Sequence, residues 1–285
     1  MHFQPETFNT EHGTRNTEHR TQNTEHGTNQ LINQLPNKLI LKALIFAAGL
    51  GTRLKPLTDT LPKALLPIAG KPLLEHVILK LKAAGFDEII VNVHHFPEQI
   101  IDFLTSKRNF DIRIEVSDER NLLLDTGGGI QNVKWFFDDG KPFLVHNVDI
   151  LSNLDLKVLY DVHLKTNPLA TLVVSERKTF RYLMFNDENR LCGWINEKTG
   201  ETKPVGFKMV RGLNKLAFSG IQVLSPLVFD LMDGHEKKFP IMDFYLKNAT
   251  TQIINGYIPS DFNMMDVGKL DVLEEAERFI TTPKP

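Results

Sequence analysis

The chain has 285 residues, of which 41% are hydrophobic and 24% are charged, a balance typical of a globular protein with a large buried core. Its 33 basic and 35 acidic side chains give a formal net charge of -2, so no overall field would draw it to nucleic acid or to an anionic membrane. The sequence has a single cysteine, no apolar run long enough to span a bilayer and no signal-peptide pattern. We therefore expect a cytoplasmic protein, monomeric or homodimeric, with neither nucleic acid nor membrane as a partner.

The first forty residues differ from the rest. Residues 9–29 repeat a seven-residue unit three times, NTEHGTR, NTEHRTQ and NTEHGTN, with almost no apolar side chain. Such a segment can form neither a coiled-coil seam nor a core, so we predict that residues 1–40 are a disordered, repeat-containing extension. The repeat, and the absence of methionine between Met1 and Met184, suggest a misplaced start with Leu41 as a candidate beginning, which the mass of the native N-terminus would test. We expect a single domain over residues 41–285.

From Lys42 onwards, apolar strands and amphipathic helices alternate. A buried strand over 42–47 leads into a glycine-rich turn, and apolar residues at helical spacing predict a helix over 71–85 that ends at Gly85. Further predicted strands are 88–93, 111–117 and 142–150, and further predicted helices are 97–106 and 126–137. This order predicts an α/β fold with a Rossmann-like, mostly parallel sheet and helices on both faces, in which ligands bind at the carboxyl ends of the strands.

The second half of the chain continues the alternation with more strands. A hairpin is predicted from 181–186 and 190–196 around the turn DEN. The region from Lys198 to Asn214 is rich in Gly, Lys and Pro without a clear period, which favours a loop or a flap over a site. The other expected elements are a helix over 156–165, strands over 170–176, 216–224 and 251–259, helices near 225–231 and 240–248, the segment 261–268 and a last helix over 269–280.

The strongest local signal is the stretch AAGLGTRLKPLTDTLPKALLPIAGKP at residues 47–72. Gly49 and Gly51 would let backbone amides approach phosphate oxygens, while Arg53 and Lys63 would supply positive charge. The stretch is not a dinucleotide fingerprint, because Leu54 occupies the third glycine position, and it is not a P-loop, because no GK[ST] follows at the right spacing. The pattern predicts an anion site of another kind.

The runs GLGTRL, PLT, PKALLPI and GKP resemble the signature of sugar-phosphate nucleotidyltransferases, and the similarity extends over residues 42–280. The later motifs LLLDTGGGI, NVD, AFSGI and MDVG are most similar to those of N-acetylmuramic acid 1-phosphate uridylyltransferases. The resemblance implies the nucleotide-diphospho-sugar transferase fold. It also implies Mg²⁺ as cofactor, with a nucleoside triphosphate and a sugar 1-phosphate as substrates.

The resemblance also implies roles for individual residues. It places the nucleoside against Phe46, Ala47, Ala48 and Gly49, the triphosphate against Gly51, Thr52 and Arg53, and the α-phosphate or the sugar phosphate beside Lys63. It places the base against the turn formed by Gly127, Gly128 and Gly129, where a side chain would collide with it. The expected substrate-binding residues are Asn92, Asp125, Asn147, Ser219 and Gly220. His94 and His95 are weaker candidates for the sugar site.

Two aspartates complete the predicted site. Asp149 follows an apolar strand and Asp266 lies in MMDVG, and the resemblance implies that together they hold Mg²⁺ while leaving positions for phosphate oxygens. One residue departs from the family pattern: relatives commonly carry Gly before the first metal aspartate, whereas this chain has Val148. A valine restricts the backbone and adds bulk beside the metal, so the local turn or the metal affinity should differ.

The sequence therefore predicts a direct displacement, in which the sugar 1-phosphate attacks the α-phosphorus of the nucleotide and pyrophosphate leaves. Arg53, Lys63, Asp149 and Asp266 are the expected catalytic residues. The preferred hypothesis is uridylyl transfer to N-acetylmuramic acid 1-phosphate. The alternatives are a guanylyl- or cytidylyltransferase for mannose, heptose or choline phosphate, and a non-catalytic nucleotide-sugar binding paralogue.

Overall fold

Four parallel strands form the part of the sheet in which the sequence signals are strongest. They lie in the order β6 (Phe143–Asn147), β1 (Leu41–Phe46), β4 (Phe86–Val93) and β5 (Arg113–Asp118). The computed structural model describes residues 40–208 and 210–282, which belong to one compact unit. The extension predicted at the start of the chain falls on residues 1–39, outside the described residues.

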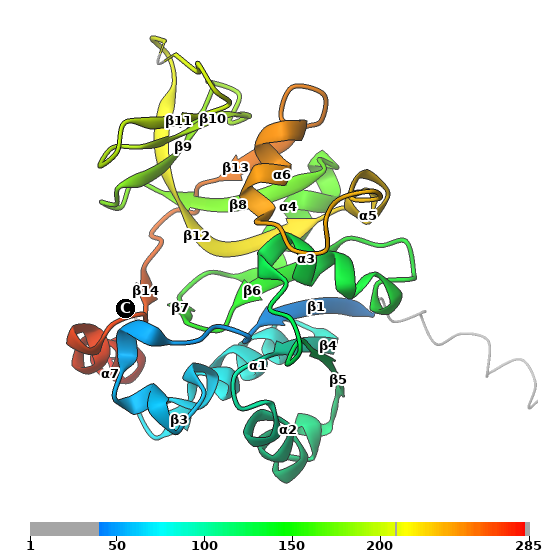
Figure 1. Cartoon of the computed structure of the whole chain (residues 1–285), viewed down its shortest axis with the longest axis vertical. Helices are drawn as coiled ribbons and strands as arrows, with labels where there is room; N and C mark the ends of the chain where they lie inside the picture. Colours follow the sequence, from blue (N-terminus) through cyan, green and yellow to red (C-terminus); the bar gives the residue numbers. More distant parts are fainter. Residues whose placement is uncertain (1–39, 209, 283–285) are drawn as a thin grey trace, which may run out of the picture. The chain divides into compact units, whose positions relative to one another are not determined.

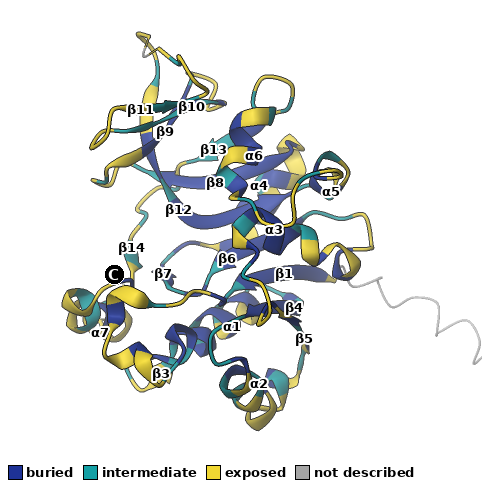
Figure 2. Cartoon of the chain, in the orientation of Figure 1, coloured by how far each residue is buried: buried dark blue, intermediate teal, exposed yellow. Residues whose placement is uncertain are grey.

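The inner strands β1 and β6 are mostly apolar runs because both faces of the sheet are covered, whereas the edge strand β5, RIEVSD, alternates. On β1, Ala43 and Ile45 pack into one hydrophobic cluster, while Leu44 between them packs into a second cluster on the opposite face. Figure 2 shows the strands buried and the outward faces of the helices exposed. The predicted helices on both faces are confirmed. One cluster takes residues from α1 (Leu73–Ala83), α2 (Pro97–Ser106), α4 (Leu156–Thr166) and α7 (Leu273–Thr281), and the other from α3 (Asp125–Asn132), α5 (Leu227–Leu231) and α6 (Ile241–Asn248).

The remainder of the ten-stranded sheet is largely antiparallel. The long strand β12 (Asn214–Leu224) runs antiparallel to β6, β8 (Ala170–Ser175) and β9 (Arg181–Phe185). The predicted hairpin of β9 and β10 (Leu191–Asn196) is confirmed, and β13 (Ile254–Tyr257) pairs parallel with β8. The sheet is therefore mixed and not mostly parallel. Residues 186–208 and 210–213, which connect β9 to β12, include no helix, so these two neighbours lack the crossover connection that parallel strands need.

Several short elements surround this sheet. The two-stranded pairs are β7 (Ile150–Ser152) with β14 (Met264–Asp266), and β2 (Pro67–Ile68) with β3 (Lys71–Pro72). The 3-10 helices are Thr52–Leu54, Leu57–Asp59, Lys63–Leu65, Arg108–Asp111, Lys134–Phe136 and Leu270–Val272. Among the described residues, no helix has the length and apolar character required to cross a bilayer.

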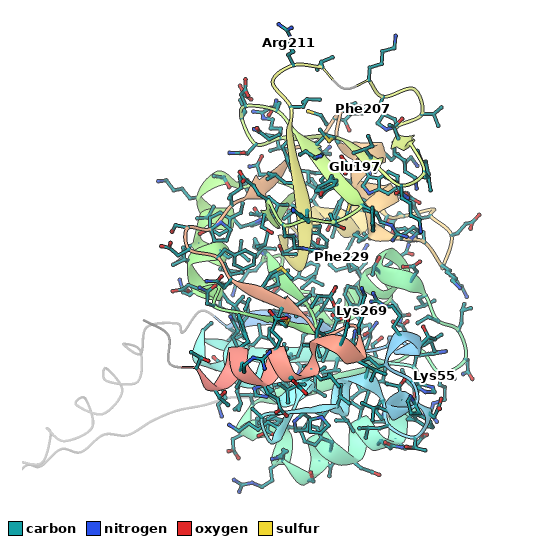
Figure 3. The ribbon with its side chains drawn as sticks, turned by 90° about the vertical axis from the view of Figure 1, so that its left-hand side faces the viewer. Lys55, Glu197, Phe207, Arg211, Phe229 and Lys269 are labelled. Carbon is teal, nitrogen blue, oxygen red and sulfur yellow. The ribbon has the colours of Figure 1, made fainter. Side chains whose placement is uncertain are left out.

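The segment expected to be a loop or flap contains one short strand. Residues Glu201–Lys203 form β11, which extends the β9–β10 hairpin, and Lys203 pairs with Asp243 on α6 at 2.7 Å. The ring of Phe207 packs so closely on Gly193 of β10 that a Cβ there would lie 2.6 Å from it. Figure 3 shows Arg211 at the top of the view and Phe207 below it, both well above Lys269 and Lys55. Apart from β11, the described residues between Lys198 and β12 have turns and irregular structure, so the prediction of a loop is wrong only for Glu201–Lys203.

Candidate active site

A cavity of about 520 Å³ opens at the carboxyl ends of the parallel strands, where ligands bind in sheets of this kind. The register aligns Phe46 at the end of β1 with Asn92 on β4 and with Asn147 on β6. The cavity joins the turn after β1 to the ends of β4 and β6 and to the residues before α3 and α6. It is lined by Phe46, Ala47, Ala48, Gly49, Leu50, Gly51, Thr52, Arg53, Lys63, Asn92, Leu123, Asp125, Thr126, Asn147, Val148, Asp149, Lys238 and Gly268.

The turn after β1 is held by hydrogen bonds from the segment that follows it. Gly51 has φ +63°, and its carbonyl oxygen accepts hydrogen bonds from Leu54 N and Thr58 Oγ1, both at 2.8 Å. Leu54, where a third glycine would stand in a dinucleotide fingerprint, is fully buried and anchors the turn in the core. Arg53 between them is exposed and makes no hydrogen bond or ion pair with another described residue. Its guanidinium is therefore available to an anion in the cavity.

The amides of Ala47 and Ala48 are occupied by a side chain of the protein. Asn92 Oδ1 accepts from Ala47 N at 2.7 Å and from Ala48 N at 3.2 Å, and Asn92 Nδ2 donates to Glu119 Oε1 at 2.9 Å. Burial raises the pKa of Glu119, against the opposing effect of the Asn92 hydrogen bond. Asn92, predicted to bind substrate, lines the cavity but uses its amide to hold the turn.

Lys63 and Asp149 form an ion pair at the floor of the cavity. Lys63 is buried, and its ammonium contacts Asp149 Oδ2. The other carboxylate oxygen, Oδ1, has no hydrogen bond to a described residue. The pair brings a cation and a potential metal ligand to the same wall, and leaves one oxygen of Asp149 for another partner.

The second predicted metal ligand lies on a neighbouring segment. β14 runs antiparallel to β7 with Asp266 opposite Ile150, and Val267 N donates to Asp149 O at 2.9 Å (Figure 1). Asp266 is exposed. Its Oδ1 and Arg53 Nη2 lie 2.7 Å and 2.8 Å from the position that a Cβ on Gly268 would take. Two segments more than a hundred residues apart thus pair their backbones at Asp149 and Asp266, and each aspartate has a cation of the cavity nearby, Lys63 for Asp149 and Arg53 for Asp266.

These donors fit a magnesium ion. Mg²⁺ in proteins is commonly held by one or two carboxylates, with substrate phosphates and water completing six positions. The described residues contain no group of three or more His, Cys, Asp and Glu side chains able to hold a metal, as a closed structural site would require. Asp149 and Asp266 would therefore share the ion with a phosphate ligand.

Val148 is accommodated without strain in the turn. Its side chain is 5% exposed and packs in a hydrophobic cluster, and its amide donates to Phe46 O at 3.1 Å. Its φ is outside the left-handed region that favours glycine. The valine thus packs in the core, and its backbone amide connects the end of β6 to β1.

The three glycines of α3 lie behind the cavity wall. A Cβ on Gly127 would lie 2.3 Å from the Phe239 ring, and one on Gly128 only 2.1 Å from Lys237 O. The chain before α6 is also bonded here: Gly127 N and Gly128 N donate to Phe239 O at 2.8 Å and 3.2 Å, Phe239 N donates to Leu124 O at 3.3 Å, and Ile241 N donates to Thr126 Oγ1 at 2.9 Å. None of the three glycines lines the cavity, and packing against protein explains why they are small.

Ser219 and Gly220 also lie outside the cavity lining. The pairing of β12 with β8 shifts register between Phe218 and Gln222, and Gly220 has φ +74° at this irregularity. A Cβ on Gly220 would lie 2.8 Å from Asn147 Nδ2, so the glycine makes room for a cavity residue. The Ser219 hydroxyl is buried without a hydrogen-bond partner among the described residues. It is not accessible to a substrate in this arrangement.

The two histidines after β4 are engaged within the protein. His94 Nδ1 donates to Glu119 O at 2.7 Å, and His95 Nε2 lies 3.3 Å from Thr58 O. Neither lines the cavity. Both connect the end of β4 to neighbouring segments, so the structure gives no support for their weaker candidacy at the sugar site.

Sequence reasoning missed several residues of the lining, of which Lys238 is the most relevant chemically. It is exposed, precedes α6 and makes no hydrogen bond or ion pair with another described residue. Together with Arg53 and Lys63 it gives the cavity three cations. The adjacent Lys237 and Lys238 were a visible signal, but nothing local shows that the segment folds back over α3. The other missed lining residues are Leu50, Leu123 and Gly268.

A sequence profile of the family described as Nucleotidyl transferase matches residues 42–283, most of the chain. The N-acetylmuramate alpha-1-phosphate uridylyltransferase of Neisseria meningitidis is 35% identical over 191 residues, which cover 67% of this chain and 78% of that protein. The chain belongs to the Nucleotidyl transferase family.

Two further relatives of this Nucleotidyl transferase family member show how wide the family is. The UTP–glucose-1-phosphate uridylyltransferase of Synechocystis is 29% identical, over 81% of this chain and 61% of its own length. Mannose-1-phosphate guanylyltransferase 1 of Arabidopsis thaliana is 32% identical, over 68% of this chain and 52% of its own length. The chain thus spans less than two thirds of these two proteins.

Solved structures agree on the fold. A putative glucose-1-phosphate thymidylyltransferase from Bacillus anthracis superimposes with a TM-score of 0.72 and 17% identity, over 86% of this chain and 97% of that one. At this identity the likeness shows the fold alone. It confirms the predicted α/β architecture of the family.

Gly49 provides a way to separate the role of this family member's turn from its stability. A Cβ on Gly49 would meet no protein atom within 4 Å, so Gly49→Ala should change the free energy of unfolding by less than about 1 kcal/mol. The added methyl group stands beside the proposed phosphate site, and we expect the KM for the triphosphate to rise about tenfold. Steady-state kinetics and urea unfolding measure the two effects.

Gly51→Ala is the matched control. Its Cβ would lie 2.8 Å from Thr58 Cγ2, and φ +63° disfavours alanine, so this variant should lose stability as well as affinity. Equal losses of stability in the two variants would contradict the distinction.

Proposed function

We propose that this chain transfers a nucleotidyl group from a nucleoside triphosphate to a sugar 1-phosphate and releases pyrophosphate. One observation carries the proposal: the glycine turn, Arg53, Lys63 and Asp149 line a single cavity, and both Arg53 and Asp266 pack around Gly268 in its lining. Cations that contact phosphate oxygens and two adjacent carboxylates are the groups that phosphoryl chemistry of this kind requires. Membership of the family supports the same reaction.

In the proposed reaction an oxygen of the sugar 1-phosphate attacks the α-phosphorus. The bond from that phosphorus to the bridging oxygen breaks, and pyrophosphate leaves with the electron pair. The attacking oxygen is already ionised, so no general base and no covalent intermediate are needed. Arg53 and Lys63 would orient the phosphates and offset their charge. A Mg²⁺ ion held by Asp149 and Asp266 would neutralise charge on the triphosphate oxygens.

For the substrates we propose uridylyl transfer to N-acetylmuramic acid 1-phosphate. The support is the Neisseria relative. Its identity to this chain is higher than that of the Synechocystis and Arabidopsis relatives, and the match covers a larger share of its own length. Guanylyl transfer to mannose 1-phosphate is the second candidate, favoured by the plant relative at 32% identity. Both candidates share the chemistry at the α-phosphorus and differ only in the groups read by the cavity walls.

The test is a pyrophosphate-release assay with the full chain. It crosses UTP, GTP, CTP and dTTP with N-acetylmuramic acid 1-phosphate, glucose 1-phosphate and mannose 1-phosphate, and reactions without acceptor are the control. We expect kcat/KM to be at least about tenfold higher for UTP with N-acetylmuramic acid 1-phosphate than for any other pair, a discrimination of about 1.4 kcal/mol. A preference for GTP with mannose 1-phosphate would select the second candidate. Nucleotide binding in calorimetry without pyrophosphate from any pair would indicate a non-catalytic paralogue and refute the proposal.

A further inference from the structure

Glu119 lies between two walls of the cavity without lining it. One wall is the turn after β1, represented by Ala47 and Ala48, and the other is the segment from Leu123 to Thr126 that leads into α3. Glu119 directly follows β5, its amide donates to Val93 O at 2.8 Å, and it is 3% exposed. A buried carboxylate needs hydrogen-bond donors to offset its lost hydration; one donor here is Asn92, which lines the cavity, and the other is Leu124 N, within the second wall segment.

The hydrogen bonds of Glu119 form a chain with a fixed direction. The amides of Ala47 and Ala48 can only donate, so Asn92 must present its oxygen to them and its amide group to Glu119 Oε1. Glu119 Oε2 accepts from Leu124 N at 3.1 Å, on the opposite wall. Each link is a donor facing an acceptor. Because the side chain of residue 119 faces a donor at each end, it must offer two acceptor atoms.

The surroundings leave little room for adjustment. A Cβ on Gly129 of α3 would lie 3.0 Å from Phe46 Cε1, 3.2 Å from Glu119 Oε1 and 3.4 Å from Asn92 Nδ2. The helix backbone therefore packs directly against the bonded atoms. Asn92 is also 2% exposed, so water does not replace a lost link easily.

We propose that Glu119 is a positioning residue that sets the separation of the two cavity walls and thereby the affinity for the nucleoside triphosphate. The identity of the ligand in this inference rests on the proposed function, whereas the hydrogen-bond network does not depend on it. Glu119 does not line the cavity in which the substrates would react. It acts through Asn92 on the turn and through Leu124 on the segment before α3.

Glu119→Gln tests the direction of the chain. Glutamine offers one oxygen and one amide group to two donors, so one link becomes donor against donor in either orientation. We expect the KM for the triphosphate to rise about tenfold, which corresponds to about 1.4 kcal/mol, with less than a threefold change in the KM for the sugar phosphate. Asn92→Asp should have a similar effect, because two buried carboxylates would then face each other.

The double variant Asn92→Asp with Glu119→Gln is the decisive control. The aspartate would accept from Ala47 and Ala48 and from the glutamine amide, while the glutamine oxygen would accept from Leu124 N. This reverses one link and preserves the total charge of the network. We expect the KM for the triphosphate to return to within about threefold of the original protein. A double variant whose KM reflects the sum of the two single losses would overturn the inference.

Amide hydrogen exchange tests the network without turnover. The amides of Ala47, Ala48 and Leu124 should exchange at least about tenfold faster in each single variant and slowly again in the double variant. Equal exchange in all four proteins would overturn the inference whatever the activity. If the original protein binds no triphosphate, the proposed function is refuted. If the original protein is active and the Glu119→Gln variant has the same KM for the triphosphate, only the role of Glu119 is refuted.

Discussion

Replacing Asp149 by asparagine is expected to lower kcat at least about 100-fold while the protein still folds. Asparagine has the same shape but lacks the charge, so it is a poor ligand for Mg²⁺ and compensates little of the positive charge on Lys63. The backbone of the site should persist, because Val267 bonds to the carbonyl oxygen of Asp149 and not to its side chain. Turnover, circular dichroism and thermal unfolding measure the two parts of this prediction.

Asp266→Asn should reduce turnover to a similar degree with less effect on stability. Asp266 is exposed, whereas Asp149 neutralises a buried lysine. Raising the Mg²⁺ concentration should recover part of the lost activity in either variant. Asp271→Asn is the control, because Asp271 is also exposed and lies five residues further along the chain. Near-normal turnover in both Asp149→Asn and Asp266→Asn would show that the metal site is assigned wrongly.

The free energy of unfolding is expected to fall steeply as the pH drops from about 6.5 to about 4. His146 and His163 are both fully buried, and burial lowers the pKa of each ring from 6.5 to about 4. In each ring Nδ1 has a hydrogen-bond partner, Asn147 O for His146 and Thr171 Oγ1 for His163, whereas Nε2 has none among the described residues. A proton on Nε2 would therefore place a charge in an apolar environment.

The sign follows from which state binds the proton first. Below pH 6.5 the unfolded chain takes up a proton on each histidine while the folded chain does not, so unfolding becomes more favourable. The loss stops once the folded protein is protonated too, near pH 4. For a difference of this size it is on the order of 3 kcal/mol for each ring. Urea unfolding between pH 7.5 and pH 4.5 measures it.

Two variants isolate the contribution of one ring. His163→Leu should flatten the acid decline relative to the original protein, because it removes one of the two groups. Thr171→Val is the matched control: it removes the hydrogen bond to Nδ1 but keeps the histidine, so the decline should remain. Parallel curves for His163→Leu and the original protein would rule out a role for this histidine.

The parallel half of the sheet could be predicted from sequence because its physics is local. Strands such as β1 and β4 are buried on both faces, and this produces continuous apolar runs separated by amphipathic helices. β12 could not be placed in the same way. It pairs with β6, β8 and β9 at once, and no periodicity along its own residues shows which partners it takes.

The candidate site shows the same division. The glycine turn, Arg53 and Lys63 are close in sequence, and their spacing alone predicts an anion site. The placement of Asp266 near Asp149 depends on pairing between β7 and β14. Only the resemblance to a family indicated that these two aspartates act together. Glu119 was missed, although it stands directly after β5, where the rule about strand ends would have drawn attention to it. Lys238 reaches the cavity through tertiary folding of an irregular segment, which has no sequence period.

The bonds between α3 and the chain before α6 bear on how ligands enter and leave. Gly127, Gly128 and Phe239 form three backbone hydrogen bonds in this region, and Ile241 adds a fourth to the Thr126 hydroxyl. Swinging this segment aside would break all four at once, at roughly 1 kcal/mol each. We therefore expect this segment to stay in place when ligands bind and leave. Substrate and product are then expected to pass along the opposite rim, between the glycine turn and Gly268, where the exposed Arg53 can contact an incoming anion.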